Sequence, residues 1–333
     1  METKRVVVIG GGTGTFTVLS GLKKYPLDLT AIVTISDSGG STGKLKDEFG
    51  YLPVGDSRMA LVALAESDDE NEVLRRLFLY RFDKGDGLRG HNFGNLFLVA
   101  LSEVFGSQVK AMEYASKVLR VRGKVLPISN ESGDLIAEYE GGEIMVGETH
   151  VDEPSSRHDG RKRIEKLWLQ PEVGIAPEAK RAIQEADLVV LGPGDLYTSL
   201  VANLAVKGVP ETIQKSKAKV VYVVNLIAKF GQTFGFTASD HVEELQKYLG
   251  KYPDVVLMNN RKLPKAILKK YALEKGFPVK DDLRKKNNLP FAVVRVDLLG
   301  SEEIKKRSGD VLRRSLIRHD SAKLARAVVK ALC

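Results

Sequence analysis

Six short apolar segments of this chain, each about as long as a β-strand, are followed directly by glycine, asparagine or aspartate. The first two lead into glycine-rich loops at residues 10–14 and 36–43. Parallel strands place their carboxyl ends on one edge of a sheet, and in open α/β folds ligands bind at that edge. Glycine loops that enter helices also offer unpaired backbone N–H groups to anions. The pattern predicts a mostly parallel α/β sheet that binds a phosphate or a nucleotide.

The chain is long enough for one large domain. Its 333 residues are 43% apolar, which is sufficient for a substantial core. The helical and strand-like patterns alternate along most of the chain, but residues 121–172 are rich in alternating and β-branched residues separated by turns. We expect a single domain over residues 1–333 with a small antiparallel β insertion at about 121–172, in which 125–128 forms the first strand. We also expect loops at 36–50 and 277–290 and an edge segment at 312–317.

The charge and the cysteine content argue against several classes of function. The net charge is +8, but the 51 basic residues are interleaved with 43 acidic ones, so we expect no nucleic-acid binding. Cys333 is the only cysteine, which excludes an intrachain disulfide and a thiolate metal site. No apolar run is long enough to span a bilayer, and the start lacks a secretory pattern. We expect a cytoplasmic protein, with the oligomeric state left open.

The first glycine loop follows a strand and precedes a helix, which is the context of a phosphate cradle. Its candidate ligand-binding residues are Gly11, Gly12, Thr13 and Gly14. The dinucleotide spacing G-x-G-x-x-G is only partly met, because Thr15 stands where a third glycine or alanine is needed. Asp37 lies 23 residues after Gly14, where an NAD-binding fold keeps its ribose-binding carboxylate. An NAD-linked oxidoreductase therefore stays an alternative.

The second glycine loop resembles a P-loop but has the wrong spacing. Gly39 and Gly43 enclose three residues instead of four, and Leu45 follows Lys44 where a Ser or Thr is required. The loop nevertheless carries Asp37, and Asp56 follows some twenty residues later. These two carboxylates are candidates for a Mg²⁺ site and for catalysis, because hard cations prefer oxygen ligands. The alternative is that Asp56 caps the next helix.

Further polar residues at strand ends and helix starts complete the candidate site. They offer amide, hydroxyl, imidazole or guanidinium groups that suit phosphate, sugar or base recognition. They are Ser38, Gly39, Lys44, His91, Asn92, Asn95, Gly192, Gly194, Asp195, Asn225, Asn259 and Arg318.

The ordered motifs GGGTG, SDSGGSTG, GDSR, GHNFGN, GPGD and RHD resemble those of the gluconeogenesis factor family of bacteria, over nearly the whole chain. This family is a branch of the CofD-like superfamily, which includes 2-phospho-L-lactate transferase. The resemblance implies a Rossmann-like three-layer fold that binds a nucleotide-linked ligand at the sheet edge. In the transferase branch, acidic residues at the positions of Asp37 and Asp56 hold Mg²⁺ while phospholactate moves from a nucleotide-activated donor to a deazaflavin hydroxyl. That branch tends to carry paired aspartates, whereas here Ser36 and Ser38 flank Asp37.

The gluconeogenesis factor branch matches the motifs better. It is associated with UDP-sugar binding and with control of cell shape and wall synthesis during gluconeogenic growth. The resemblance thus implies a nucleotide-sugar-binding regulator, with a Mg²⁺-dependent transferase as the alternative.

Overall fold

A computed structural model describes residues 3–67, 69–285, 288–300 and 316–332. Its main sheet has seven parallel strands in the order β12-β10-β8-β7-β1-β2-β3. Strand order reverses between β1 and β7, so the chain builds outward from β1 in one direction and then in the other. In this Rossmann-like arrangement the chain continues from the two central strands toward opposite sides of the sheet, and this is the position at which ligands bind in open α/β folds. The α/β prediction is confirmed.

The strands of the main sheet are short and apolar. They are β1 (Lys4–Gly10), β2 (Leu27–Val33), β3 (Lys124–Pro127), β7 (Leu188–Leu191), β8 (Lys219–Val223), β10 (Val255–Asn259) and β12 (Ala292–Val296). Their side chains alternate between two cores, because successive residues of a strand point to opposite faces. Val6 and Val8 pack on one face with Leu19 of the first helix. Val7 and Ile9 pack on the other face with Ile183. Burial on both faces explains why the strands are continuous apolar runs.

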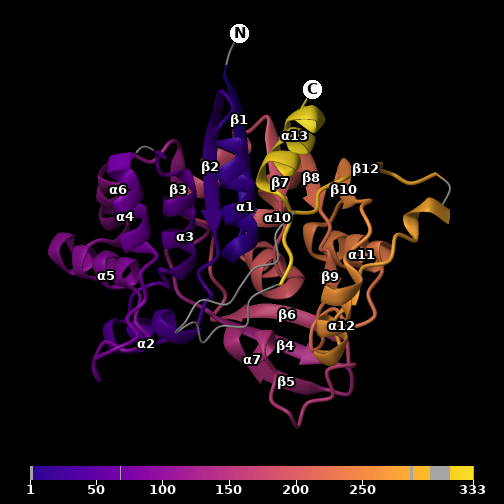
Figure 1. Cartoon of the computed structure of the whole chain (residues 1–333), viewed down its shortest axis with the longest axis horizontal. Coiled ribbons are helices and arrows are strands. Elements are labelled where there is room, and N and C mark those ends of the chain that lie inside the picture. Colours follow the sequence, from indigo (N-terminus) through magenta and orange to yellow (C-terminus); the bar gives the residue numbers. More distant parts are fainter. Residues whose placement is uncertain (1–2, 68, 286–287, 301–315, 333) are drawn as a thin grey trace.

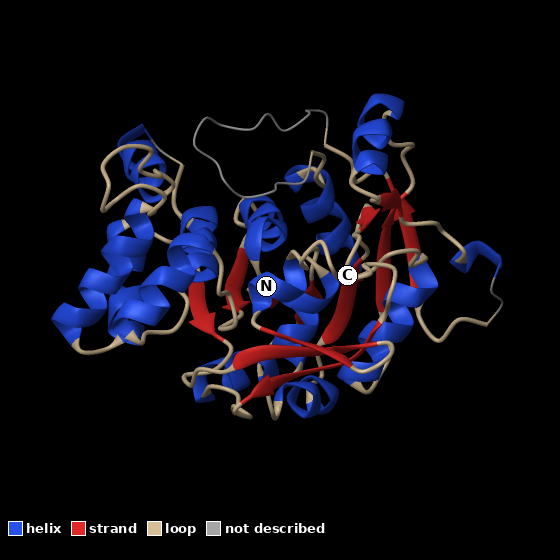
Figure 2. Cartoon of the chain, turned by 90° about the horizontal axis from the view of Figure 1, so that it is seen from below, coloured by secondary structure: helices blue, strands red, loops and turns tan. Residues whose placement is uncertain are grey.

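Helices cover both faces of this sheet, and Figure 2 shows them on either side of it. The helices of the first half are α1 (Gly12–Leu22), α2 (Gly40–Phe49), α3 (Gly55–Leu64), α4 (Asp69–Phe78), α5 (Phe93–Phe105) and α6 (Gln108–Val118). Those that follow β7 are a π-helical turn (Leu196–Val201), α9 (Ala202–Leu204), α10 (Val209–Lys215), α11 (Ala238–Leu249), α12 (Lys265–Leu273) and α13 (Ser321–Leu332). A short 3₁₀ turn covers Leu283–Lys285, and α8 (Pro177–Gln184) precedes β7. Helix α13 returns to pack against α1.

A three-stranded antiparallel sheet forms the insertion. It consists of β4 (Asp134–Tyr139), β5 (Glu143–Val146) and β6 (Ile164–Gln170), with the short helix α7 (Glu148–Asp152) between β5 and β6. Figure 1 shows it beyond the lower end of the main sheet, on the side opposite the two chain ends. Strand β1 runs downward from the N-terminus in that view, so the insertion lies at the edge where the strands end.

Several expected elements differ from the structure. Residues 125–128 were assigned to the insertion, but β3 pairs in parallel with β2 and is an edge strand of the main sheet. Residues 40–49 form α2 instead of a loop, and within the expected β insertion residues 148–152 form the helix α7. Within 277–290 a two-residue strand, β11 (Phe277–Pro278), pairs with β9 (Ile227–Ala228). In each case a short segment has no periodicity strong enough to fix its state. The expected edge segment at 312–317 falls largely outside the described residues.

Candidate functional site

The two central glycine loops meet at the reversal of strand order. A Cβ added to Gly14 would collide with the Pro193 carbonyl oxygen. A Cβ on Gly194 would lie 3.7 Å from the carbonyl oxygen of Gly11. At Gly14 only glycine permits this approach, because a side chain there would push the loop after β1 away from the loop after β7. The structure therefore brings the predicted residues Gly11, Gly14 and Gly194 together.

Asp56 closes the β1 loop from a third segment. Its Oδ1 accepts a hydrogen bond from the Gly12 amide at 2.7 Å, and its Oδ2 occupies the space that a Cβ on Gly11 would need. Asp56 lies in the first turn of α3 but does not cap that helix, whose N-cap is Val54. The alternative of a simple helix cap does not describe its contacts. The Gly12 amide, which the sequence predicts to face a phosphate, donates to this carboxylate.

Asp37 lies beside Asp56. Its Oδ1 accepts from the Gly39 amide at 2.9 Å, and its Oδ2 occupies the space that a Cβ on Gly55 would need. Burial raises the pKa of Asp37. Burial and the charge of Asp37 together raise the pKa of Asp56 to about 7. Two carboxylates that oppose each other's ionisation stand where a cation or a proton would be stabilised.

The insertion contributes two more acids that sequence reasoning missed. Burial, with Asp37 as the next cause, raises the pKa of Glu148 to about 9. Burial and the nearby Asp195 raise the pKa of Asp152 to about 6. Both residues belong to α7, which also touches the second glycine loop through a 3.1 Å hydrogen bond from the Thr149 amide to Ser38 Oγ. No motif marked these acids, because only the tertiary fold places α7 over the sheet edge.

Lys229 connects the acids of the insertion with the central loops. Its Nζ lies 2.6 Å from Asp152 Oδ1 and 3.0 Å from Asp195 Oδ2. Burial alone would lower the pKa of Lys229, but the two carboxylates raise it. The predicted residue Asp195 is therefore at the site, in an ion triad with a lysine that sequence analysis did not single out.

His91, Asn92 and Asn95 lie behind the second glycine loop. Asn92 caps α5 by accepting from the Asn95 amide at 3.2 Å, and His91 Nδ1 lies 3.3 Å from Ser41 Oγ. The side chain of Asn95 accepts from Arg58 Nε at 2.7 Å. All three side chains are buried and bonded within the chain. They support the loop and, through Arg58, place a guanidinium near Asp37, so in this structure their contacts are structural.

Asn225 and Asn259 differ in what their side chains contact. Asn225 Nδ2 donates to the Gly194 carbonyl at 2.8 Å, which joins the end of β8 to the central loops. Its Oδ1 is buried and has no hydrogen-bond partner among the described residues. The Asn259 amide is bonded to its local backbone, at 2.7 Å to the Arg261 carbonyl and at 3.1 Å from the Leu298 amide. Asn225 retains an acceptor for a ligand, whereas Asn259 is a turn residue.

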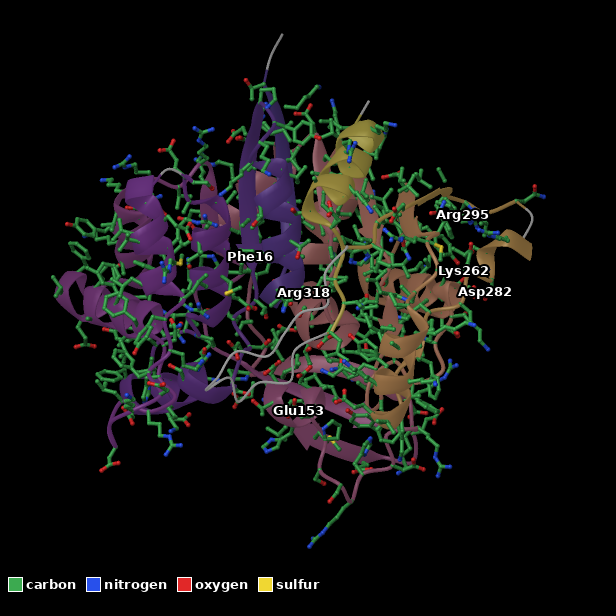
Figure 3. The ribbon with its side chains drawn as sticks, viewed as in Figure 1. Phe16, Glu153, Lys262, Asp282, Arg295 and Arg318 are labelled. Carbon is green, nitrogen blue, oxygen red and sulfur yellow. The ribbon has the colours of Figure 1, made fainter. Side chains whose placement is uncertain are left out.

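A pocket of about 370 Å³ adjoins Asn225. Asn225 and Asn259 line it together with apolar residues of β10, of α12 and of the segment that follows β8. Three basic residues, Arg261, Lys262 and Lys265, also line it. Arg318 precedes α13, and its neighbour Asp320 caps that helix through the amides of Ala322 and Lys323 at 2.9 Å. Figure 3 shows Arg318 just below the start of α1, at the edge where the strands end. Lys44 is exposed on α2.

The described part of the chain has no helix long and apolar enough to cross a membrane.

The described residues contain no group of three or more His, Cys, Asp or Glu side chains arranged to hold one metal ion. Two carboxylates such as Asp37 and Asp56 would therefore need oxygens from a ligand or from water to complete a magnesium shell. This is the usual way in which proteins bind Mg²⁺ with a phosphate.

Comparisons with known proteins agree with this architecture. The model of the family "2-phospho-L-lactate transferase CofD" matches residues 6–299. The chain is 39% identical to the gluconeogenesis factor of Bacillus subtilis, with 99% of each chain covered. It is also 39% identical to the gluconeogenesis factor of Halalkalibacterium halodurans, with 99% of this chain and 97% of that protein covered. A crystal structure of a Bacillus halodurans protein, at 38% identity, superposes with a TM-score of 0.88 over 98% of this chain and 100% of that one. The chain belongs to the CofD family and, within it, to the gluconeogenesis factors.

Proposed function

We propose that this protein is a regulator that binds a nucleotide-sugar in the crevice between β1 and β7. The observation that carries the proposal is the convergence of the Gly11–Gly14 backbone with Gly194 at the reversal of strand order. In that place a diphosphate would receive backbone N–H groups from the start of α1, and Arg318 or Lys44 would balance its charge.

The adjoining pocket suits the remainder of such a ligand. Its volume of about 370 Å³ and its mixture of apolar and basic residues accommodate a base or a sugar next to a phosphate. Asn225 Oδ1 is a buried acceptor, and a ring N–H of a base such as uracil would satisfy it. Because Asn225 also bonds to Gly194, its side chain links the pocket to the diphosphate loops.

The carboxylates at the same edge imply that a cation accompanies the ligand. Asp37, Asp56, Glu148 and Asp152 disfavour one another's ionisation, and those that are ionised would repel a diphosphate. Asp37 and Asp56 would hold Mg²⁺ together with phosphate oxygens, and bound Mg²⁺ would neutralise this repulsion. The fit rests on the donor set, which consists of two acids that resist being ionised together.

Regulation would follow from the position of α7. This helix contacts the Ser38 loop directly, and its Asp152 is joined to Asp195 by Lys229. A ligand bound between these loops would therefore favour one placement of the insertion over others. The related proteins named gluconeogenesis factor suggest the physiological setting. We infer control of carbon flux in gluconeogenic growth, and of wall synthesis and cell shape, in a cytoplasmic protein.

Calorimetry with UDP-N-acetylglucosamine tests the binding proposal. The intact chain should bind, and Asn225→Asp should weaken binding by about tenfold or more because it puts a negative charge at the ligand. Asn260→Asp is the matched control, since Asn260 is exposed and its side-chain amide donates to the Arg295 carbonyl outside the proposed ligand contacts. Absence of binding to the folded protein at millimolar ligand would overturn the proposal.

A transferase is the second candidate, favoured by the Asp37 and Asp56 pair and by the family description. In that reaction an acceptor hydroxyl attacks phosphorus, the nucleotide leaves, and the hydroxyl proton passes to a base. A nucleotide-activated phospholactate and a deazaflavin acceptor are the substrates to test. Turnover that is abolished by Asp37→Asn and by Asp56→Asn would favour the transferase over a regulator without catalytic activity. An NAD-linked oxidoreductase stays the weaker alternative, and binding of NADH followed by fluorescence tests it.

A further inference from the structure

Helix α4 exposes an apolar strip on its solvent side. Val73 is 67% exposed, and Leu77 and Tyr80 are 39% and 47% exposed. Val73 and Leu77 are four residues apart and therefore lie on one side of α4, and Tyr80 follows shortly after the helix ends at Phe78. Glu72 and Arg76 are exposed beside them and lie one turn apart. We call these five residues the α4 strip.

Exposed apolar side chains are concentrated in this part of the molecule. Of the twelve large apolar side chains that are exposed in the described chain, seven fall between residues 73 and 114. Figure 1 shows α4, α5 and α6 together on the left of the molecule, away from the insertion. Single exposed apolar residues are normal, but a concentration of this kind marks an interaction surface. This surface lies apart from the residues proposed to bind the nucleotide-sugar.

The charges of the α4 strip are complementary to themselves. A two-fold axis perpendicular to a helix places the helix antiparallel to its copy and brings residues of the same flank together. Glu72 and Arg76 share one flank, so Glu72 of each chain would meet Arg76 of the other. The same operation brings Val73 of one chain to Leu77 of the other. The Glu72 carboxylate is already oriented by Arg75 at 3.0 Å and is still 54% exposed.

We propose that the α4 strip is the contact between two copies of this chain in a symmetric dimer. Val73 and Leu77 form the apolar centre of the contact, and Tyr80 lies toward its end. The two equivalent Glu72–Arg76 pairs lie along one side of this centre and fix the antiparallel register. The proposal goes beyond nucleotide-sugar binding and does not depend on it.

Light scattering after size-exclusion chromatography tests the proposal with the intact chain. We expect a mass of about twice the 36.6 kDa of one chain, and a mass near 36.6 kDa for Leu77→Lys. Leu273→Lys is the control, because Leu273 is 87% exposed outside this surface and should leave the dimer intact. Circular dichroism checks that each variant is folded. A monomeric wild type, or a dimer that Leu77→Lys leaves unchanged, would overturn the proposal.

Charge reversal gives a second test that loss of folding cannot imitate. Arg76→Glu places an acid opposite Glu72 in both pairs of its own dimer. Glu72→Arg places a base opposite Arg76 in the same way, so each variant alone should dissociate. A mixture of the two variants pairs acids with bases and should restore a mass of about two chains. If both variants stay monomeric when they are mixed, the proposed register is wrong.

Discussion

The backbone amide of Gly12 donates a hydrogen bond of 2.7 Å to the carboxylate of Asp56, across 44 residues of sequence. This contact joins the first glycine loop to the start of α3 and holds an acid where a ligand phosphate is expected. A phosphate that takes the Gly12 amide would displace Asp56 or require that its charge be neutralised. Ligand binding, protonation and cation binding are therefore linked at this point.

The pKa of Asp56, about 7, predicts how stability depends on pH. The Asp56 carboxyl holds its proton more tightly in the folded chain than in the unfolded chain, where its pKa has the ordinary value of 3.8. The free energy of unfolding should therefore decrease as the pH rises from about 4 to 7. Asp56→Asn removes this contribution, and we expect its melting temperature at pH 8 to exceed that of the wild type by a few degrees. The exposed Asp47→Asn is the control. Equal pH dependence in Asp56→Asn and wild type would contradict the assignment.

Gly14→Ala should separate the two central loops. The new Cβ would collide with the Pro193 carbonyl oxygen, and backbone cannot yield as a flexible side chain would. We expect a loss of about 1–3 kcal/mol in the free energy of unfolding, together with weaker nucleotide-sugar binding. Gly87→Ala is the matched control, because no atom lies within 4 Å of its Cβ position. Denaturant unfolding measures the stability, and full binding by a normally stable Gly14→Ala protein would count against the proposed site.

Lys229→Met should leave Asp152 and Asp195 without their shared cation. Because Lys229 is partly exposed, we expect a loss of only about 1–2 kcal/mol at pH 8. The loss should be smaller at pH 5, since the pKa of Asp152 is about 6 and protonation removes one of the two charges. Thermal unfolding at the two pH values measures the difference. Adding Asp152→Asn to Lys229→Met should recover part of the loss at pH 8, and no recovery would show that the triad is not the cause.

Magnesium should strengthen diphosphate binding. We expect UDP-N-acetylglucosamine to bind about tenfold more tightly with Mg²⁺ than after treatment with EDTA, because the cation offsets the charge of Asp37 and Asp56. Asp37→Asn should reduce this difference while the protein stays folded. Glu48→Gln, on the exposed end of α2, is the control. An equal affinity with and without Mg²⁺ would remove the magnesium site and leave the nucleotide-sugar proposal in place.

The sequence by itself determined the parallel sheet and the positions of its central loops. Val6–Ile9 and Leu188–Leu191 are apolar without interruption because both faces of their strands are buried. Gly14, in the loop after the first strand, is required because a side chain there would collide with the Pro193 carbonyl oxygen of the facing loop. These features depend on local residue type, so periodicity and glycine spacing were sufficient to find them.

Only the tertiary structure decided which polar residues share the site. Glu148, Asp152 and Lys229 carry no motif, and they meet the central loops because α7 of the insertion packs over the sheet edge. His91 and Asn95 do carry motifs, yet burial directs their bonds to Ser41 and Arg58. Side-chain contacts between segments distant in sequence depend on packing, and no local pattern encodes that. The sequence located the edge of the sheet, and packing selected the charges that surround it.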